Sequence, residues 1–262
     1  SLLIMGKNVD QHLEGSNSNE FFSGWMIEHE HSSIHLGQQG YLASKKFDSE
    51  MDLREKEGAF VHLKWEKKTI ELTHDCFGLY PILSFQEKDF FVASDSLLVL
   101  SKIRTMMNIN NTVNGRVHAT RSWGHGLAQC IMSTKTIVKG IEYLPPASSI
   151  KVSAIEHDGE IPVLSVTKKI PKMPRFFSAP KDAYEDILTR GLKEIIGPIK
   201  AMEATHGVQT FLGLSGGLDS RVLLACALHE VKGASKMAVR TNTHSSSKND
   251  LEVVQNLAEE YG

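Results

Sequence analysis

Hydrophobic and polar positions alternate over short runs through the first two thirds of the chain. These runs are rich in β-branched and aromatic residues and are bounded by Gly, Asp or Pro, a pattern that predicts short strands. The predicted strands are residues 24–27, 59–65, 69–73, 90–93 and 149–152. A charged turn between the second and third runs predicts a hairpin, so we expect a largely antiparallel layer. Leu97, Leu98 and Ile103 predict a short helix over 94–102.

Prolines interrupt the pattern in residues 160–181. This stretch contains Pro162, Pro171, Pro174 and Pro180 together with several lysines. It is unsuited to a helix interior or a central strand, because proline lacks the backbone N–H and has a fixed φ. We therefore expect one domain over 1–165, a linker over 166–181 and a second domain over 182–262.

The second domain alternates helix and strand. Apolar residues at helical spacing predict a first helix with Asp182 as its cap; they are Tyr184, Ile187, Leu188, Leu192, Ile195 and Ile196. A strand over 208–214, a helix over 219–230, a strand over 237–241 and a helix over 250–261 follow. Alternating elements predict an α/β domain. Two strands are fewer than a doubly wound sheet normally has, so we expect an incomplete domain.

Composition describes an ordinary globular protein. The chain is 41% hydrophobic and 23% charged with a formal net charge of −2, so no basic excess suggests nucleic acid. No apolar run reaches the length of a membrane span and the start, residues 1–5, is too short for a signal peptide, so we expect a cytoplasmic protein without a membrane partner. Cys76, Cys130 and Cys226 lie too far apart to predict a disulfide framework or a zinc site.

The most informative segment is 211–221, which reads FLGLSGGLDSR. An apolar strand enters a Ser-Gly-Gly turn and then a helix. Glycines let backbone N–H groups approach an anion while the helix points its positive end at the same place. The loop lacks the Lys and spacing of a Walker loop, so it is not arranged for γ-phosphate transfer. The alternative is a Gly-rich turn in which Asp219 only caps the helix.

An SGGxDS motif directly after a strand resembles that of the pyrophosphate-loop ATP hydrolases, which cut ATP between its α and β phosphates. The resemblance implies Mg²⁺ as cofactor with Asp219 as its ligand, since a carboxylate beside phosphates requires a divalent cation between them. The residues that it assigns to ATP are Leu214, Ser215, Gly216, Gly217, Asp219 and Ser220.

Four segments of the first domain occur in an order that narrows the choice among families with a pyrophosphate loop. They are GAFV at 58–61, DCFGLYPIL at 75–83, FVASD at 91–95 and GIEYLPPA at 140–147. Their order resembles the glutaminase-like domain of asparagine synthetases and β-lactam synthetases, and lasso-peptide cyclases share that plan. With the loop, the resemblance covers about residues 20–262. It implies an α+β N-terminal Ntn-hydrolase-like sandwich followed by an incomplete α/β doubly wound pyrophosphate-loop domain.

The chain departs from this pattern where glutamine would be hydrolysed. Glutamine-using members begin with a catalytic Cys and have an Asn-Gly pair in the oxyanion hole. Here no Cys precedes the first strand, and Asn114-Gly115 comes too late in the order. We expect Ser1 to be an artificial remnant of cloning; the alternative is that it serves as an N-terminal nucleophile. We therefore expect a degenerate glutaminase-like domain and identify no catalytic residue in it.

The resemblance implies a reaction in which a carboxylate attacks the α phosphorus of ATP, pyrophosphate leaves, and an amine or ammonia attacks the acyl-adenylate to form an amide. The substrates would be a small-molecule or peptide carboxylate and the nitrogen nucleophile, and a homodimer is compatible with this plan. Two alternatives stay open: a non-catalytic ATP-binding piece, and a true glutamine-hydrolysing asparagine synthetase. Because the chain starts without Met and ends after a helical pattern, we expect a piece of a longer protein whose substrate-selecting residues follow Gly262.

Three further groups of residues are candidates for a functional role. His29, His31 and His35 cluster with Glu28 and Glu30, and alternation in a strand would place His29 and His31 on one face. The cluster suggests either a metal site or a solvated polar face; its spacing is not diagnostic for metal, which favours the polar face. Residues 123–126 (WGHG) receive no role. Arg221 follows the loop and is placed to reach either a phosphate or a helix partner.

Overall fold

The computed structural model describes residues 19–28, 33–46, 51–66, 68–87, 90–122, 133–155, 163–170, 183–204, 211–230, 238–241 and 248–261. The chain divides into two compact units, residues 1–26 with 35–173 and residues 27–34 with 174–262. Mixed helices and antiparallel sheets are present, which confirms the α+β prediction at this level.

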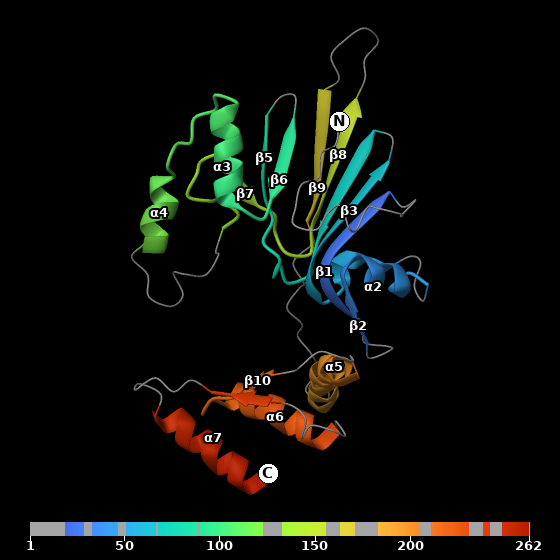
Figure 1. Cartoon of the computed structure of the whole chain (residues 1–262), viewed down its shortest axis with the longest axis vertical. Coiled ribbons are helices and arrows are strands. Elements are labelled where there is room, and N and C mark those ends of the chain that lie inside the picture. The colour runs from blue at the N-terminus through green and yellow to red at the C-terminus, as the bar shows by residue number, and fades with distance from the viewer. Residues whose placement is uncertain are drawn as a thin grey trace. The chain divides into compact units, whose positions relative to one another are not determined.

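The larger sheet has six strands among the described residues (Figure 1). In sheet order they are β2 (Ser33–Leu36), β1 (Glu20–Glu28), β3 (Gly58–Glu66), β4 (Thr69–His74), β8 (Ser149–Ile155) and β9 (Val163–Lys169). The pairs β1–β3, β3–β4, β4–β8 and β8–β9 are all antiparallel. The strands predicted at 24–27, 59–65, 69–73 and 149–152 lie inside β1, β3, β4 and β8, so these predictions are confirmed.

A smaller sheet and two helices complete the first unit. The sheet order is β6 (Phe91–Ser94), β5 (Leu83–Gln86) and β7 (Glu142–Tyr143), and the helices are α3 (Leu97–Met106) and α4 (Gly115–Ser122). The helix predicted over 94–102 starts later, because Ser96 caps it by accepting a hydrogen bond from the N–H of Val99. Leu97 and Ile103 pack into the core as expected, whereas Leu98 is 65% exposed.

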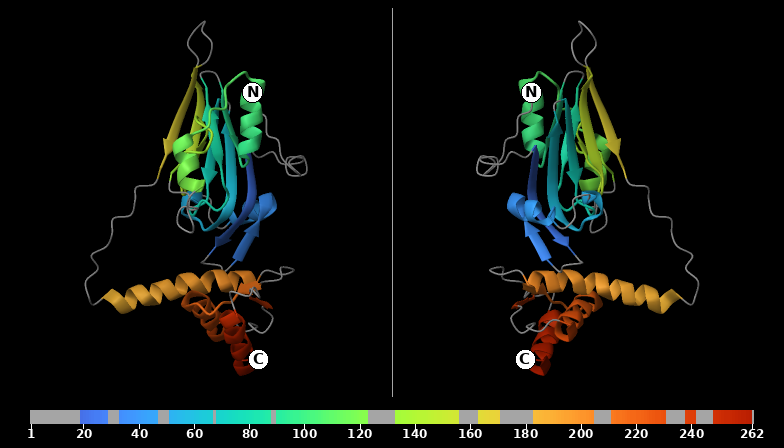
Figure 2. Two further views of the ribbon diagram at one scale, coloured as in Figure 1. Left: turned by 90° about the vertical axis from the view of Figure 1, so that its left-hand side faces the viewer. Right: turned by 90° about the vertical axis from the view of Figure 1, so that its right-hand side faces the viewer.

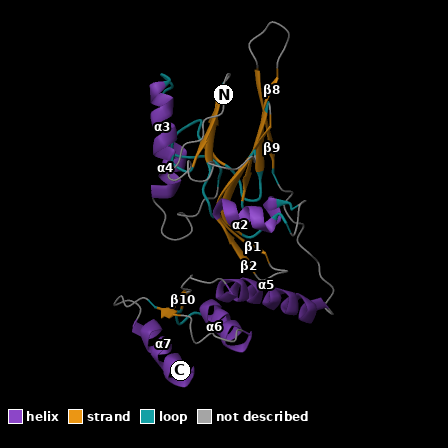
Figure 3. Cartoon of the chain, turned by 45° about the vertical axis from the view of Figure 1, so that its right-hand side comes forward, coloured by secondary structure: helices purple, strands orange, loops and turns teal. Residues whose placement is uncertain are grey.

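Helices and sheets of the first unit lie in layers (Figure 3). Three apolar clusters fill the spaces between the layers. One lies between the two sheets and includes Leu72, Ile82 and Ile150. A second lies between the smaller sheet and α3 and includes Phe85 and Leu100. The third lies between the larger sheet and two short helices, α2 (Gly37–Ser44) and the 3₁₀ helix η1 (Leu53–Glu55). The order of layers is therefore helix, sheet, sheet, helix.

Helix α2 was not predicted, because its sequence GQQGYLAS contains two glycines and few apolar residues. Tertiary contacts stabilise it instead. The ring of Tyr41 stacks on Phe22 of β1 with centroids 4.9 Å apart, and the Gln38 amide donates to the carbonyl of Glu20 at 3.2 Å. Packing against a strand thus overrides a low helix propensity.

Strand β9 lies within the proline-interrupted stretch, residues 160–181, and was also not predicted. Val163–Lys169 contains no proline and pairs with β8 over its whole length. Among the described strands it lies at the end of the larger sheet, a position that tolerates nearby proline better than a central one. Pro171, Pro174, Pro180 and Asp182 lie outside the described residues, and the predicted linker over 166–181 stays a prediction.

A buried carboxylate organises the turn between β4 and β5, within the DCFGLYPIL segment. Asp75 is fully buried and accepts hydrogen bonds from the backbone N–H groups of Phe77, Leu79 and Tyr80, at 3.2, 2.9 and 3.0 Å. Its own carbonyl accepts from the N–H of Ala147 at 2.9 Å. A buried charge is stable only when it is bonded in this way, so the segment has a structural role here.

The second unit contains three helices and a two-stranded parallel sheet among its described residues. They are α5 (Tyr184–Ala204), β10 (Phe211–Gly213), α6 (Leu218–Glu230), β11 (Ala238–Arg240) and α7 (Lys248–Tyr261). Figure 2 shows α5 as one continuous helix. Ile195, Ile196 and Ile199 pack against Cys226 and Ala227 of α6, but Tyr184 and Leu188 at the start of α5 are exposed. The alternation of helix and parallel strand agrees with the predicted order of elements.

No helix among the described residues combines the length and the apolar character that a membrane crossing requires.

Candidate functional site

The predicted phosphate-binding loop follows β10 directly. Leu214 is 4% exposed, and its N–H donates to the carbonyl of Arg240 at 2.9 Å, which extends the parallel ladder by one residue. Beyond Leu214 the chain turns through Ser215, Gly216 and Gly217 and enters α6 at Leu218. The turn therefore begins after Leu214, because this residue is buried and is still hydrogen-bonded to the neighbouring strand.

A set of hydrogen bonds between two serines shapes the turn. The hydroxyls of Ser215 and Ser220 lie 3.1 Å apart. The N–H of Ser215 donates to Ser220 Oγ at 3.1 Å, and the N–H of Gly217 donates to Ser215 Oγ at 3.2 Å. The structure thus brings these predicted residues together at the start of α6, where backbone N–H groups and the helix dipole favour an anion.

Asp250 contacts the loop, and sequence reasoning did not assign it a role. Its Oδ1 atom accepts a hydrogen bond from the N–H of Gly216 at 2.7 Å, the length typical of a charge-assisted bond. Asp250 lies in the first turn of α7, 34 residues along the chain from Gly216. The signal that could have indicated it is an acidic residue in the helix that follows β11, because parallel strands place their following turns at the same edge of a sheet.

Asp219, the predicted Mg²⁺ ligand, is exposed in the first turn of α6. Asp219 and Asp250 together supply carboxylate oxygens, the ligand type that Mg²⁺ prefers. No cluster of three or more His, Cys, Asp or Glu suitable for a metal is found in the part of the chain that the structure describes. Mg²⁺ commonly binds through one or two carboxylates plus phosphate oxygens and water, so the residues present fit an ion that arrives with a nucleotide.

Arg221 was expected to reach either a phosphate or a helix partner, and in the structure it contacts the backbone of its own helix start. Its Nε atom donates to the carbonyl of Gly217 at 3.3 Å, one helical turn earlier. In this conformation the guanidinium braces the loop against the first turn of α6.

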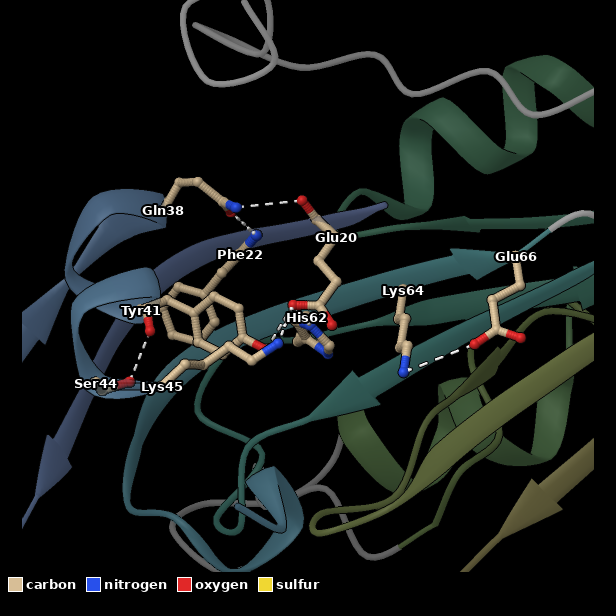
Figure 4. A network of polar contacts seen from close by, with 9 residues as sticks. All are labelled: Glu20, Phe22, Gln38, Tyr41, Ser44, Lys45, His62, Lys64 and Glu66. Atoms are coloured by element: carbon tan, nitrogen blue, oxygen red, sulfur yellow. Dashed lines mark hydrogen bonds and ion pairs between the residues drawn. The ribbon is translucent and has the colours of Figure 1, made fainter. Parts of the chain in front are cut away.

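A second polar group lies in the first unit, on the side of the larger sheet that α2 covers (Figure 4). Lys45 pairs with Glu20 at 2.8 Å, and the hydroxyl of Tyr41 donates to the same carboxylate at 3.1 Å. His62 Nε2 lies 4.0 Å from Glu20 Oε2 and is buried without a hydrogen-bond partner in the described structure.

Burial and pairing shift the pKa values in this group. Burial is the largest effect on Glu20 and alone would raise its pKa, but the hydrogen bond and charge of Lys45 bring the net pKa below its ordinary value. Burial lowers the pKa of His62 to about 4, so its ring is neutral near pH 7. Burial, reinforced by the Glu20 charge, raises the pKa of Tyr41, so its hydroxyl stays protonated.

This group lines a cavity of about 390 Å³ together with residues of η1, β4 and β9. The cavity has charges of both signs, and two of its cations are already paired: Lys45 with Glu20, and Arg54 with Asp52. Near pH 7 the histidine that lines it is neutral and the tyrosine hydroxyl is protonated.

Two of the three cysteines, Cys76 and Cys226, lie among the described residues. Cys76 is half-buried in the turn after β4, and burial raises the pKa of its thiol to about 11, far from the thiolate that catalysis needs. Cys226 is buried in α6. Cys130, Ser1, His29, His31 and residues 123–126 lie outside the described residues, while His35 is buried in β2.

No model of a known protein family matches the chain, and no curated protein matches its sequence.

Proposed function

We propose that the chain is part of an ATP-dependent, amide-forming synthetase that adenylates a carboxylate, releases pyrophosphate and transfers the acyl group to an amine or ammonia. The observation on which this rests is the strand–turn–helix at β10 and α6. There the Ser-Gly-Gly turn, two serine hydroxyls and a helix start converge.

In this proposal the loop binds the pyrophosphate end of ATP. Ser215, Gly216 and Gly217 would offer backbone N–H groups, and Ser220 a hydroxyl. Asp219 would hold Mg²⁺, which when bound would neutralise charge on the departing pyrophosphate. Donors fixed in place before the reaction stabilise developing charge without reorganising, which is the usual source of catalysis in phosphoryl chemistry.

We further propose that the first unit is a glutaminase-like domain of the kind found in asparagine synthetases and β-lactam synthetases, without glutaminase activity. Its helix–sheet–sheet–helix layering supports an Ntn-hydrolase-like sandwich. The buried Asp75 and the raised pKa of Cys76 support a structural role for the segment that most resembles those families. The nitrogen would then come from ammonia or an amine.

The test is ATP–pyrophosphate exchange by the purified protein with Mg²⁺ and a panel of carboxylates, starting with aspartate and other amino acids. Exchange that depends on one carboxylate supports adenylation. Binding of Mg·ATP without exchange for any carboxylate would favour the non-catalytic ATP-binding alternative. The absence of Mg·ATP binding would contradict the proposal.

A further inference from the structure

Three successive backbone N–H groups at the loop each face a side-chain oxygen of the chain itself. The N–H groups of Ser215 and Gly217 face serine hydroxyls, at 3.1 and 3.2 Å. The N–H of Gly216 faces the carboxylate of Asp250, at 2.7 Å. The donors that an anion would use are therefore occupied by oxygen atoms of the protein.

The three partners differ in how easily they yield to a phosphate. A hydroxyl can rotate and become a donor, so Ser215 and Ser220 can turn from occupying an N–H group to binding an anion. A carboxylate only accepts hydrogen bonds and is negatively charged. Asp250 is thus the partner that opposes a phosphate both by occupying a donor and by repulsion.

The position of Asp250 is set by close packing. A Cβ atom placed on Gly216 would lie 2.7 Å from Asp250 Oδ1 and 3.9 Å from Val253 Cγ2, so the first two turns of α7 lie directly against the loop. Gly216 permits this approach because it has no side chain. Asp250 is partly buried, which lengthens the range of its charge compared with a fully solvated carboxylate.

We propose that Asp250 is an internal anion that occupies the N–H of Gly216 and makes phosphate binding depend on a divalent cation. This inference rests on the proposed function of the loop. A phosphate that arrives without a cation must displace the carboxylate and is repelled by it. When Mg²⁺ accompanies the phosphate, the same carboxylate charge becomes favourable, and Asp250 selects the metal-bound form.

The experiment measures pyrophosphate binding to the 262-residue chain by calorimetry, with Mg²⁺ and with EDTA. The variants are Asp250→Asn, which keeps an oxygen for Gly216 but removes the charge, and Glu252→Gln, which removes an exposed charge from the same helix. Removing one charge about 4 Å from the ligand changes its affinity by at least about fivefold, the value for two fully solvated charges. We expect Asp250→Asn to bind pyrophosphate more tightly in EDTA by that factor. The ratio of its affinities with Mg²⁺ and with EDTA should fall by the same factor.

Two results would overturn the inference in distinguishable ways. If the unmodified chain binds Mg·pyrophosphate but Asp250→Asn and Glu252→Gln have equal Mg²⁺ dependence, the role of Asp250 is wrong while the loop's function stands. If the unmodified chain does not bind Mg·pyrophosphate, the proposed function fails and the inference with it. The amide resonance of Gly216 provides a check on folding: it should shift in Asp250→Asn while those of the first unit stay unchanged.

Discussion

At the scale of single residues, the loop has two kinds of contact. Some join residues of one local motif, and one joins the loop to a residue that only the fold brings close. Ser215, Gly216, Gly217 and Ser220 are adjacent in sequence, so their convergence could be predicted from spacing alone. The contact with Asp250 could not, because it depends on how α7 is placed after β11. Spacing also could not predict the partly buried Glu20 network, which joins β1, α2 and β3.

The first prediction concerns Asp219. Asp219→Asn removes the exposed carboxylate in the first turn of α6, and we expect carboxylate-dependent ATP–pyrophosphate exchange to fall by at least about a hundredfold, the typical cost of losing one group that stabilises transition-state charge. Glu259→Gln, an exposed acid on α7, is the matched control and should exchange at the normal rate. Equal rates for the unmodified chain and Asp219→Asn would rule out the metal role.

The second prediction concerns pH and His62. Its pKa is about 4 in the folded chain and near 6.5 when unfolded, so between these values the unfolded state binds more protons. Stability should therefore fall as pH decreases from 6.5 to 4, with about 2–3 kcal/mol of that loss due to His62. The lowered pKa of Glu20 adds a further loss of stability, which begins as the pH falls to the ordinary carboxyl pKa of 4.5 and grows at lower pH.

Urea unfolding of the unmodified chain and of His62→Gln at several pH values measures this contribution. The variant should show a flatter dependence between pH 6.5 and 4, whatever its absolute stability. His118→Gln changes an exposed histidine of α4 and should keep the original slope. An unchanged slope in His62→Gln would show that His62 is not buried as a neutral ring.

At the scale of elements, long alternating runs were predictable and short elements were not. The strands of the larger sheet with clear alternation, β3 and β4, were found nearly to their ends. β5 has four residues after Pro81, and β7 has two, too few to give a period. These strands exist because Leu83, Phe85 and Ile141 pack against α3, a contact that the local sequence does not contain.

The third prediction compares two glycines in different elements. Gly24 of β1 has φ +116°, and a Cβ there would lie 2.1 Å from the carbonyl oxygen of Ala59 on β3. Gly24→Ala should lower the free energy of unfolding by about 3 kcal/mol through overpacking and backbone strain. Gly191→Ala, in the open middle of α5, should instead raise it by about 0.5–1 kcal/mol. Denaturant unfolding of both variants checks the opposite signs, and a neutral Gly24→Ala would contradict the close β1–β3 approach.

At the scale of the whole molecule, the order of the four segments of the first domain predicted a sandwich followed by alternating helices and strands. The described residues show mixed helices and antiparallel sheets in the first unit, and three helices with a two-stranded parallel sheet in the second. The domain limits and the substrate were less accessible to sequence reasoning. β9 extends the larger sheet as far as Lys169 in a stretch where prolines suggested a linker. The identity of the carboxylate depends on pocket residues that no motif in this chain specifies.

The fourth prediction concerns the origin of the nitrogen. With glutamine, ATP and a carboxylate that supports exchange, we expect no glutamate release above background, whereas ammonia or an amine should support amide formation. Cys76→Ala should leave amide formation intact, because the thiol is protonated and internal. Glutamine turnover that persists in Cys76→Ala and Cys130→Ala but is lost on altering the N-terminus would restore the glutamine-hydrolysing alternative.

The central claim is that the Ser215–Ser220 loop binds the phosphates of ATP, and a crystal structure with Mg²⁺ and α,β-methylene-ATP tests it most directly. We predict that β-phosphate oxygens will lie about 3 Å from the backbone nitrogens of the Ser-Gly-Gly turn, with Asp219 directed at the metal. Asp250 should no longer accept the hydrogen bond from Gly216. Phosphates bound elsewhere on the chain, with the loop unchanged, would contradict the account.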